Sequence, residues 1–377
     1  MDYDIIIIGG SFFGLCATYE LAKSGLRVCV FEKSKIGECT KSTGIIFNYA
    51  LKDLKLPDRL IENKIDGISL YAPSMKNVVI DLRKARFYNT NTLEFLKWLK
   101  ERALSAGAEI FERKFCRKIK LWKDMAVCEE KSCNIIIFAH GPMKFPGIPL
   151  PRQNLYIGFE HIADIGFSNS NYWRMYFDNK ISPGYFSWIN PTYRQKCHIG
   201  LARNTKNKGS ISNAFSSFCK KAGIKIKKIY ETRCGIVPLS GPIEKPYGYR
   251  YLFIGDAAGQ IGAMSAGGIQ YAPRVAKILS KSVPNFIDNP TDKNIMLYKT
   301  QLYKEIGRNL KEELLLRKLY NMLDTNVKLE RFVEILDEID HKKIDEFLYR
   351  LSNMKKLDIH RLFPGIVARF PKLLFNL

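Results

Sequence analysis

The chain opens with an apolar run, a glycine turn, a helix-like run and a second apolar run. Residues 4–8 are of the kind found in a strand buried in a parallel sheet. A tight turn follows at residues 9–14, and residues 15–24 carry apolar side chains at helical spacing. Gly25 suits the end of that helix, and residues 26–31 return as a strand. The order predicts a βαβ unit, and therefore an α/β fold with a parallel sheet.

The turn has the features of a nucleotide site. It places a helix N-terminus where backbone N–H groups and the helix dipole can face a pyrophosphate. Glu32 ends the second strand eighteen residues after Gly14, where a carboxylate can accept hydrogen bonds from a ribose diol. Ser11 stands at the middle glycine of the GxGxxG pattern, and serine permits close approach if its φ is negative. An ordinary strand and tight turn is the alternative interpretation.

A second glycine motif follows more than two hundred residues later. Residues 251–259 read YLFIGDAAG, and Ala266-Gly267-Gly268-Ile269 precede a helix expected over 268–282. A strand-end carboxylate at Asp256 can bind a ribityl hydroxyl of a flavin, and the next helix N-terminus can face pyrophosphate or the isoalloxazine carbonyl edge. NAD dehydrogenases do not need this distant element, whereas FAD proteins of the glutathione-reductase type do. The pair of motifs predicts FAD.

Changes in the predicted secondary structure and in composition divide the chain. Residues 93–106 form an amphipathic helix, 135–138 a buried strand, and a Pro/Gly-rich stretch follows from 141 to 151. Residues 155–236 contain short β-like runs rich in Tyr, Phe and Trp, as in an antiparallel sheet, and the chain from 293 is helical and charged. We expect three parts: an FAD-binding domain (1–150 with 235–290), an antiparallel β substrate domain (151–234) and a helical C-terminal region (291–377).

Composition excludes several classes of protein. The 60 Lys and Arg residues exceed the 37 Asp and Glu residues by 23, which suits nucleic acid, an anionic membrane surface or an anionic ligand. Because no zinc-finger, helix-turn-helix or RNP-like pattern is present, we predict no nucleic-acid partner. The nine cysteines include no CxxC pair, so neither a metal site nor a disulfide framework is expected. No apolar run approaches the roughly 18–20 residues of a membrane span, and the acidic start argues against a secretory signal, so we expect a cytoplasmic protein.

Four segments together resemble one family. They are residues 9–33 (GGSFFGLCATYELAKSGLRVCVFEK), 183–191 (PGYFSWINP), 235–242 (GIVPLSGP) and 255–272 (GDAAGQIGAMSAGGIQYA). Over about residues 3–320 the chain resembles the FAD-dependent geranylgeranyl reductases, of the digeranylgeranylglycerophospholipid reductase type. The flavin motifs are shared with aromatic hydroxylases and halogenases, whereas residues 183–191 are similar to the PxxYxW segment of the prenyl reductases. The implied fold is a p-hydroxybenzoate-hydroxylase-like Rossmann domain with an antiparallel substrate domain.

The resemblance implies roles for individual residues. Tyr185, Trp188 and Pro191 would line a tunnel for the prenyl chain, although Tyr and Trp at such positions are also ordinary core residues. Cys116 would lie near the adenine through its backbone. The other residues implied to bind FAD are Gly9, Ser11, Phe13, Gly14, Glu32, Lys33, Ser42, Thr43, Gly44, Gly255, Asp256, Gly267, Gly268 and Ile269.

The implied reaction saturates double bonds of geranylgeranyl chains, on archaeal-type ether phospholipids, by hydride transfer from reduced flavin. An isolated alkene has no activating carbonyl, so the reaction needs a water-excluding pocket and a positioned acid. NAD(P)H or ferredoxin would reduce the FAD. The apolar and basic residues 361–377 could dock the protein on a membrane surface, or pack on their own domain.

The chain departs from the family pattern at several positions. A cysteine-glycine pair near the flavin is replaced by residues 39–44, where either Cys39 is displaced or Ser42 has replaced the cysteine. These two residues are the only candidates for a catalytic side chain. His140 stands where flavoprotein hydroxylases carry aspartate, and neither His140 nor His198 has a partner visible in the sequence. Thr92 replaces an arginine, with Arg86 as a substitute, and Ala263 replaces a proline. Two other functions stay open: an FAD monooxygenase or halogenase, and an inactive paralogue that binds prenyl lipids.

Overall fold

The computed structural model of the chain describes residues 1–38, 40–149, 153–166, 171–192, 196–289 and 291–357. Two predictions, for Cys39 and for the tail 361–377, concern residues outside these ranges. Within the described chain, no helix has both the length and the apolar character needed to cross a bilayer.

The first sheet combines strands from residues 3–138 with two strands from residues 247–253. Its order is β17-β18-β11-β1-β2-β8, and β9 and β10 continue it as a hairpin on β11. The strands are β1 (Tyr3–Ile8), β2 (Val28–Phe31), β8 (Glu109–Phe111), β9 (Ile119–Leu121), β10 (Ala126–Cys128), β11 (Lys131–Phe138), β17 (Tyr247–Gly248) and β18 (Tyr251–Phe253). The pairs of β1 with β2 and β11, of β2 with β8, and of β11 with β18 are parallel. The predicted parallel sheet is therefore present.

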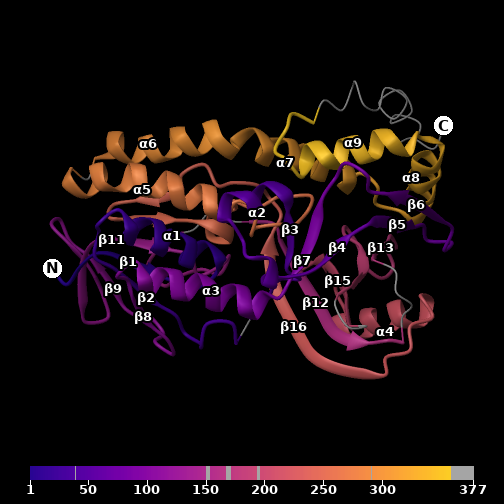
Figure 1. Cartoon of the computed structure of the whole chain (residues 1–377), viewed down its shortest axis with the longest axis horizontal. Helices are drawn as coiled ribbons and strands as arrows, with labels where there is room; N and C mark the ends of the chain where they lie inside the picture. Colours follow the sequence, from indigo (N-terminus) through magenta and orange to yellow (C-terminus); the bar gives the residue numbers. More distant parts are fainter. Residues whose placement is uncertain (39, 150–152, 167–170, 193–195, 290, 358–377) are drawn as a thin grey trace.

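The second sheet is the long one at the right of Figure 1, in the order β16-β12-β15-β14-β13-β5-β6. Its strands are β5 (Gly67–Tyr71), β6 (Asn77–Asp81), β12 (Leu155–Asp164), β13 (Tyr172–Tyr176), β14 (Ser187–Pro191), β15 (Lys196–Asn204) and β16 (Lys228–Pro238). All pairs are antiparallel except β13 with β5. An antiparallel sheet was predicted for residues 151–234. This segment does not contain the whole sheet, because β5 and β6 come from the N-terminal part. The three-domain division stays a prediction.

A small third sheet, β3-β7-β4, consists of β3 (Ile45–Phe47), β4 (Ile61–Ile65) and β7 (Phe87–Thr90). The helices cover the sheets: α1 packs against α3 and α5, α4 against β12, and α8 and α9 against β6. They are α1 (Phe12–Lys23), α2 (Asn48–Leu54), α3 (Thr92–Ser105), α4 (Ile211–Lys221), α5 (Ala272–Asp288), α6 (Asp292–Leu302), α7 (Arg308–Asn321), α8 (Asn326–Glu338) and α9 (His341–Leu351). Short 3-10 turns cover Asp58–Leu60 and Gly255–Ala258, and a π turn covers Tyr303–Gly307.

The helical C-terminal region runs along the top of Figure 1 over both large sheets. Helix α7 is tied to the second glycine motif by Glu313, which is fully buried. One carboxylate oxygen accepts from the Ser265 N–H (2.9 Å) and Oγ (2.7 Å), and the other accepts from the Tyr271 hydroxyl (2.9 Å). Because burial disfavours its charge, the pKa of Glu313 is raised. This contact fixes the C-terminal helices to the loop that precedes α5.

Candidate functional site

Both glycine motifs lie at the same edge of the first sheet. Since β1, β2, β11 and β18 are parallel neighbours, their carboxyl ends meet there. Phe13 joins the motifs: a Cβ on Gly255 would lie 2.7 Å from its ring, and a Cβ on Gly268 would lie 3.3 Å from it. The same Gly268 position is 3.5 Å from Asp256 Oδ1. The two motifs therefore form one site.

The first turn has the backbone that a bound pyrophosphate needs. Gly9 has φ +108°, and a Cβ there would lie 2.6 Å from the Ala139 carbonyl oxygen. A Cβ on Gly14 would lie 1.9 Å from the Gly9 carbonyl oxygen. Ser11 has φ −78° and caps α1 by accepting from the Gly14 N–H (3.4 Å). The φ of Ser11 is therefore negative, as close approach of a pyrophosphate at this position requires.

Glu32 lies beside this turn. Its carboxylate accepts from the Gly10 N–H (2.7 Å) and the Ser34 N–H (2.9 Å), one bond to each oxygen. A carboxylate has about four acceptor positions, so two remain for ribose hydroxyls. The Lys114 N–H donates to the Glu32 carbonyl (2.9 Å), which brings the segment leading to Cys116 alongside. Lys33, the next residue, is exposed.

Asp256 begins the second motif in a desolvated place. Burial raises the pKa of its carboxyl group from an ordinary 3.8 to about 6, against the opposing field of Lys41. The side chain thus changes protonation near neutral pH. A ribityl hydroxyl that donated to the carboxylate would favour the charged form.

Two glutamines that the sequence analysis missed have buried polar atoms without partners in the described chain. They are Gln153 Oε1 and both amide atoms of Gln270. Gln153 Nε2 donates to the Ala257 carbonyl (3.3 Å), and the Gln270 amide lies on Gly267, where a Cβ would be 1.7 Å from Nε2. Buried amides without partners are costly, so such atoms at one motif indicate a polar ligand. Together with the glycine cradles, they fit FAD.

The loop at Ser42, Thr43 and Gly44 is held between two sheets. Gly44 has φ +79°, its carbonyl accepts from Thr90 Oγ1 (2.7 Å), and its N–H donates to Ser42 Oγ (3.1 Å). Arg233 of β16 donates to the Ser42 carbonyl (2.6 Å). The Thr92 methyl is 2.6 Å from where a Gly44 Cβ would be.

Arg86, the proposed substitute for the missing arginine, is engaged elsewhere. Its guanidinium donates to the carbonyls of Arg83 (2.8 Å) and Ala85 (3.2 Å). Both acceptors lie in the same short turn of the chain. Among the described residues, Arg86 therefore makes no hydrogen bond to the Ser42 loop.

The three substrate candidates are buried. Tyr185 stacks on Phe186 with ring centroids 4.3 Å apart, and its hydroxyl reaches the Met264 carbonyl at 3.5 Å, beside the second motif. Trp188 covers Gly200 and donates its indole N–H to Glu160 (3.1 Å), and the Pro191 carbonyl accepts from Asn89 (2.8 Å). Tyr185 and Trp188 belong to the main hydrophobic core. Their role in a tunnel stays a prediction.

His140 and His198 both have partners that the sequence did not reveal. His140 Nε2 lies 2.8 Å from the Met143 carbonyl, and burial lowers the pKa of the ring. His198 Nδ1 lies 2.9 Å from Glu160 Oε1. Because strands β12 and β15 bring Glu160 and His198 together from 38 positions apart in the chain, no local spacing could have found the pair.

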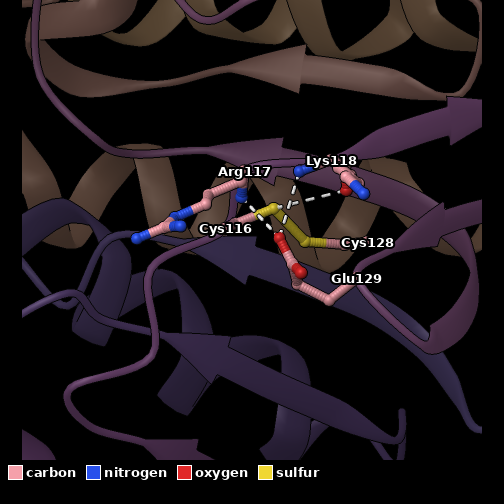
Figure 2. Close-up of a disulfide and its surroundings, with 5 residues drawn as sticks. All are labelled: Cys116, Arg117, Lys118, Cys128 and Glu129. Atoms are coloured by element: carbon pink, nitrogen blue, oxygen red, sulfur yellow. Dashed lines mark hydrogen bonds between the residues drawn. A yellow bond between two sulfur atoms is a disulfide. The ribbon is translucent and has the colours of Figure 1, made fainter.

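Figure 2 shows a disulfide between Cys116 and Cys128, although no disulfide framework was expected from the cysteine spacing. It joins the segment before β9 to β10, and both residues are buried. Glu129 next to it accepts from the Arg117 N–H (2.5 Å) and the Lys118 N–H (3.0 Å). The separation of twelve residues matches no recognised pattern, so this pair could not be predicted from the sequence. The predicted adenine contact of Cys116 stays a prediction.

Comparison with known proteins agrees with this geometry. Residues 4–85 match the family model of FAD dependent oxidoreductases. The chain is 27% identical to a digeranylgeranylglycerophospholipid reductase of Methanocaldococcus jannaschii, over 99% of this chain and 96% of the relative. It is 23% identical to a geranylgeranyl diphosphate reductase of Rhodobacter capsulatus, over 94% and 93%.

Among solved structures, a geranylgeranyl bacteriochlorophyll reductase-like protein from Thermoplasma acidophilum is similar over 98% of this chain and 99% of that chain. Its TM-score is 0.83 and its sequence identity 19%. The predicted fold class and the predicted resemblance are confirmed. The chain has the fold of an FAD-dependent oxidoreductase, and FAD is its cofactor.

Proposed function

We propose that this FAD-dependent oxidoreductase saturates carbon–carbon double bonds of geranylgeranyl chains on archaeal-type ether phospholipids. The observation that carries the proposal is the contact of Tyr185 with the Met264 carbonyl, which joins the PGYFSWINP segment to the second flavin motif. Two relatives that match nearly their whole length have geranylgeranyl reductase names, which supports the same substrate class.

Bound FAD, once reduced, supplies a hydride. The residues of the chain would hold it in place: the helix N-terminus of α1 would bind the pyrophosphate, Glu32 would accept from the ribose, and Asp256 would accept from the ribityl chain. The buried amide of Gln270, which has a donor and an acceptor without partners among the described residues, would bind a polar group of the cofactor.

The substrate side is apolar and aromatic. Tyr185, Phe186 and Trp188 would form rigid walls for a prenyl chain and exclude water from the reacting bond. The electron donor would be NAD(P)H or a ferredoxin. Because the chain of the lipid must reach the site from a bilayer, we further propose a cytoplasmic protein that docks on the membrane surface through residues 361–377.

An anaerobic single-turnover experiment tests the function. Protein with FAD reduced by dithionite is mixed with an unsaturated digeranylgeranyl phospholipid in detergent, and the return of flavin absorbance near 450 nm is followed. We expect reoxidation with the unsaturated lipid, none with the saturated lipid, and a product heavier by two hydrogens per reduced bond. The control with saturated lipid separates reduction from a detergent effect.

Other outcomes would contradict the proposal. Reoxidation only by oxygen, with hydroxylation or halogenation of an aromatic substrate, would identify a monooxygenase or halogenase. Purified protein that neither contains nor takes up FAD would identify a lipid-binding paralogue.

A further inference from the structure

A cluster of charged side chains lies buried within the second sheet. Glu160 of β12, His198 of β15 and Arg233 of β16 are 4%, 5% and 8% exposed. Glu160 Oε1 lies 2.9 Å from His198 Nδ1 and 3.8 Å from the Arg233 guanidinium. Glu160 Oε2 accepts from the Trp188 indole (3.1 Å). One carboxylate therefore holds a histidine, an arginine and the predicted tunnel tryptophan.

The strand register explains how these side chains share a face. Glu160 pairs with both Gly200 and Arg233, and Gly200 also pairs with Trp188. Paired residues of neighbouring antiparallel strands point to the same side of the sheet. Because Gly200 has no side chain, the Trp188 ring lies over it, where a Cβ would be 2.5 Å from the ring. The indole N–H can thus reach Glu160 across the strand between them.

This face of the sheet is turned to the candidate flavin loop. Arg233 links the two, since it donates to the Ser42 carbonyl (2.6 Å) as well as to Glu231 (2.7 Å). Gly235 lies two residues after Arg233 on β16. The side chain of Lys41 covers it, since a Cβ on Gly235 would be 3.0 Å from that side chain. The cluster therefore lies between the predicted prenyl-binding aromatic residues and the loop implied to contact the flavin.

Stability alone accounts poorly for such a cluster. Burying ionised groups costs several kcal/mol for each, and pairing recovers this only in part, so apolar side chains would serve the fold as well. A carboxylate on Nδ1 does something that packing does not, because it fixes the ring tautomer and orientation. With Nδ1 held by the carboxylate, Nε2 is the ring nitrogen that can donate or accept a further hydrogen bond.

We propose that His198 donates the proton that completes the reduction of the alkene, and that Glu160 is its positioning residue. This inference rests on the proposed function. The imidazolium gives up its Nε2 proton, the π electrons of the alkene form the new C–H bond, and the hydride supplied by the reduced cofactor completes the other carbon. Neutral imidazole stays bound to Glu160 and regains a proton from water. The alkene gains two hydrogens, and the cofactor loses two electrons and one hydrogen.

Other charged groups face the pair. Glu62 of β4 has a pKa raised by burial, against the positive charges of His198, Lys196 and Arg233. Glu231 pairs with Arg233 from the same strand. Glu62 therefore belongs to the charged groups around His198.

The test compares His198→Gln and Glu160→Gln with wild type in the anaerobic reoxidation assay between pH 5.5 and 9. General acid catalysis contributes roughly 10²–10⁴-fold. We expect the wild-type rate to fall at high pH. His198→Gln should slow reoxidation by about that factor and abolish this fall. Glu160→Gln should show a smaller loss. FAD content and lipid affinity should be unchanged in both.

A second measurement does not depend on turnover. Nitrogen NMR of ¹⁵N-histidine-labelled protein with FAD bound should show His198 in the Nδ1–H tautomer when neutral, and Glu160→Gln should abolish this preference. His161→Gln is the matched control. His161 is the neighbour of Glu160 on β12, lies on the other face against Phe215 (4.8 Å between ring centroids), and pairs with Thr232 Oγ1 (2.8 Å). It should behave as wild type.

The outcomes separate the two proposals. If the wild type does not transfer electrons to any prenyl lipid, the proposed function fails and the inference with it. Suppose instead that the wild type is active. If His198→Gln is folded and loaded with FAD, and if its rate lies within about threefold of wild type with the same pH profile, only the inference is overturned. A mixture of both tautomers of His198 in wild type would likewise overturn the positioning role of Glu160.

Discussion

At the scale of single residues, Glu32 connects the first turn to FAD. Its carboxylate already bonds Gly10 and Ser34, and the remaining acceptor positions suit ribose hydroxyls. Charge-assisted hydrogen bonds contribute roughly 1.5–3 kcal/mol each. We expect Glu32→Ala to be largely free of flavin after dialysis, and Glu32→Gln to retain an intermediate amount. The ratio of absorbance at 450 nm to that at 280 nm measures this, and full occupancy of the alanine variant would contradict it.

Asp256 gives a pH-dependent prediction. Because burial raises its pKa from 3.8 to about 6, the folded protein binds this proton more tightly than the unfolded chain does. The stability that Asp256 contributes is therefore complete below pH 3.8 and is lost as the pH rises through about 6. Asp256→Asn keeps a neutral side chain at every pH.

In protein stripped of FAD, Asp256→Asn should thus gain stability relative to wild type between pH 4.5 and 7.5. The gain is on the order of 2 kcal/mol, less than the full shift because the unfolded carboxyl is already mostly ionised at pH 4.5. Urea unfolding at the two pH values measures it. In the same variant the affinity for FAD should fall. A stability difference that does not change with pH would show that Asp256 is solvated.

At the scale of elements, the strand β14 presents Trp188 to the cluster of Glu160 and His198. Truncation to alanine removes the indole bond and the wall over Gly200 but touches no FAD contact. We expect Trp188→Ala to lower prenyl reduction at least tenfold while flavin content stays near that of wild type, with Trp188→Phe between the two. Parallel loss of flavin and activity would make Trp188 a core residue only.

Local patterns predicted the elements well where their cause was local. Helix α3 was expected at 93–106 and runs from Thr92 to Ser105, because its apolar spacing and the following glycine define it. The helix expected at 268–282 instead begins at Ala272 and ends at Asp288. Gly268 and Ile269 belong to the turn that Phe13 and Asp256 contact, and Phe13, which is 255 residues before Gly268, leaves no local signal there.

The candidate site follows the same rule. The glycines, Glu32 and Asp256 lie in motifs that the sequence displays, so their meeting at one sheet edge could be predicted from parallel strands. Gln270, Glu160 and Arg233 could not be found in this way. Their roles depend on burial and on strand register, neither of which is visible in the order of residues.

At the scale of the whole molecule, the net charge of +23 suits a surface that meets anionic head groups. We expect the protein to sediment with anionic vesicles at low salt and to be released as salt increases. Deletion of residues 361–377 should weaken this binding, and deletion of 371–377 alone should weaken it less. Equal recovery in the supernatant with neutral and anionic vesicles would contradict membrane docking.

The interleaving of the two large sheets has a consequence for how the chain acquires its fold during synthesis. Strand β18 must join β11 in the first sheet, and β5 must wait for β13 in the second. A nascent chain that ends at residue 150 has therefore finished neither sheet and carries unpaired edges in both. Pairing between strands that are far apart in the sequence slows folding, and the unpaired strand edges can aggregate in the meantime. Ribosome-bound intermediates of this protein should depend on chaperones until about residue 253 has emerged.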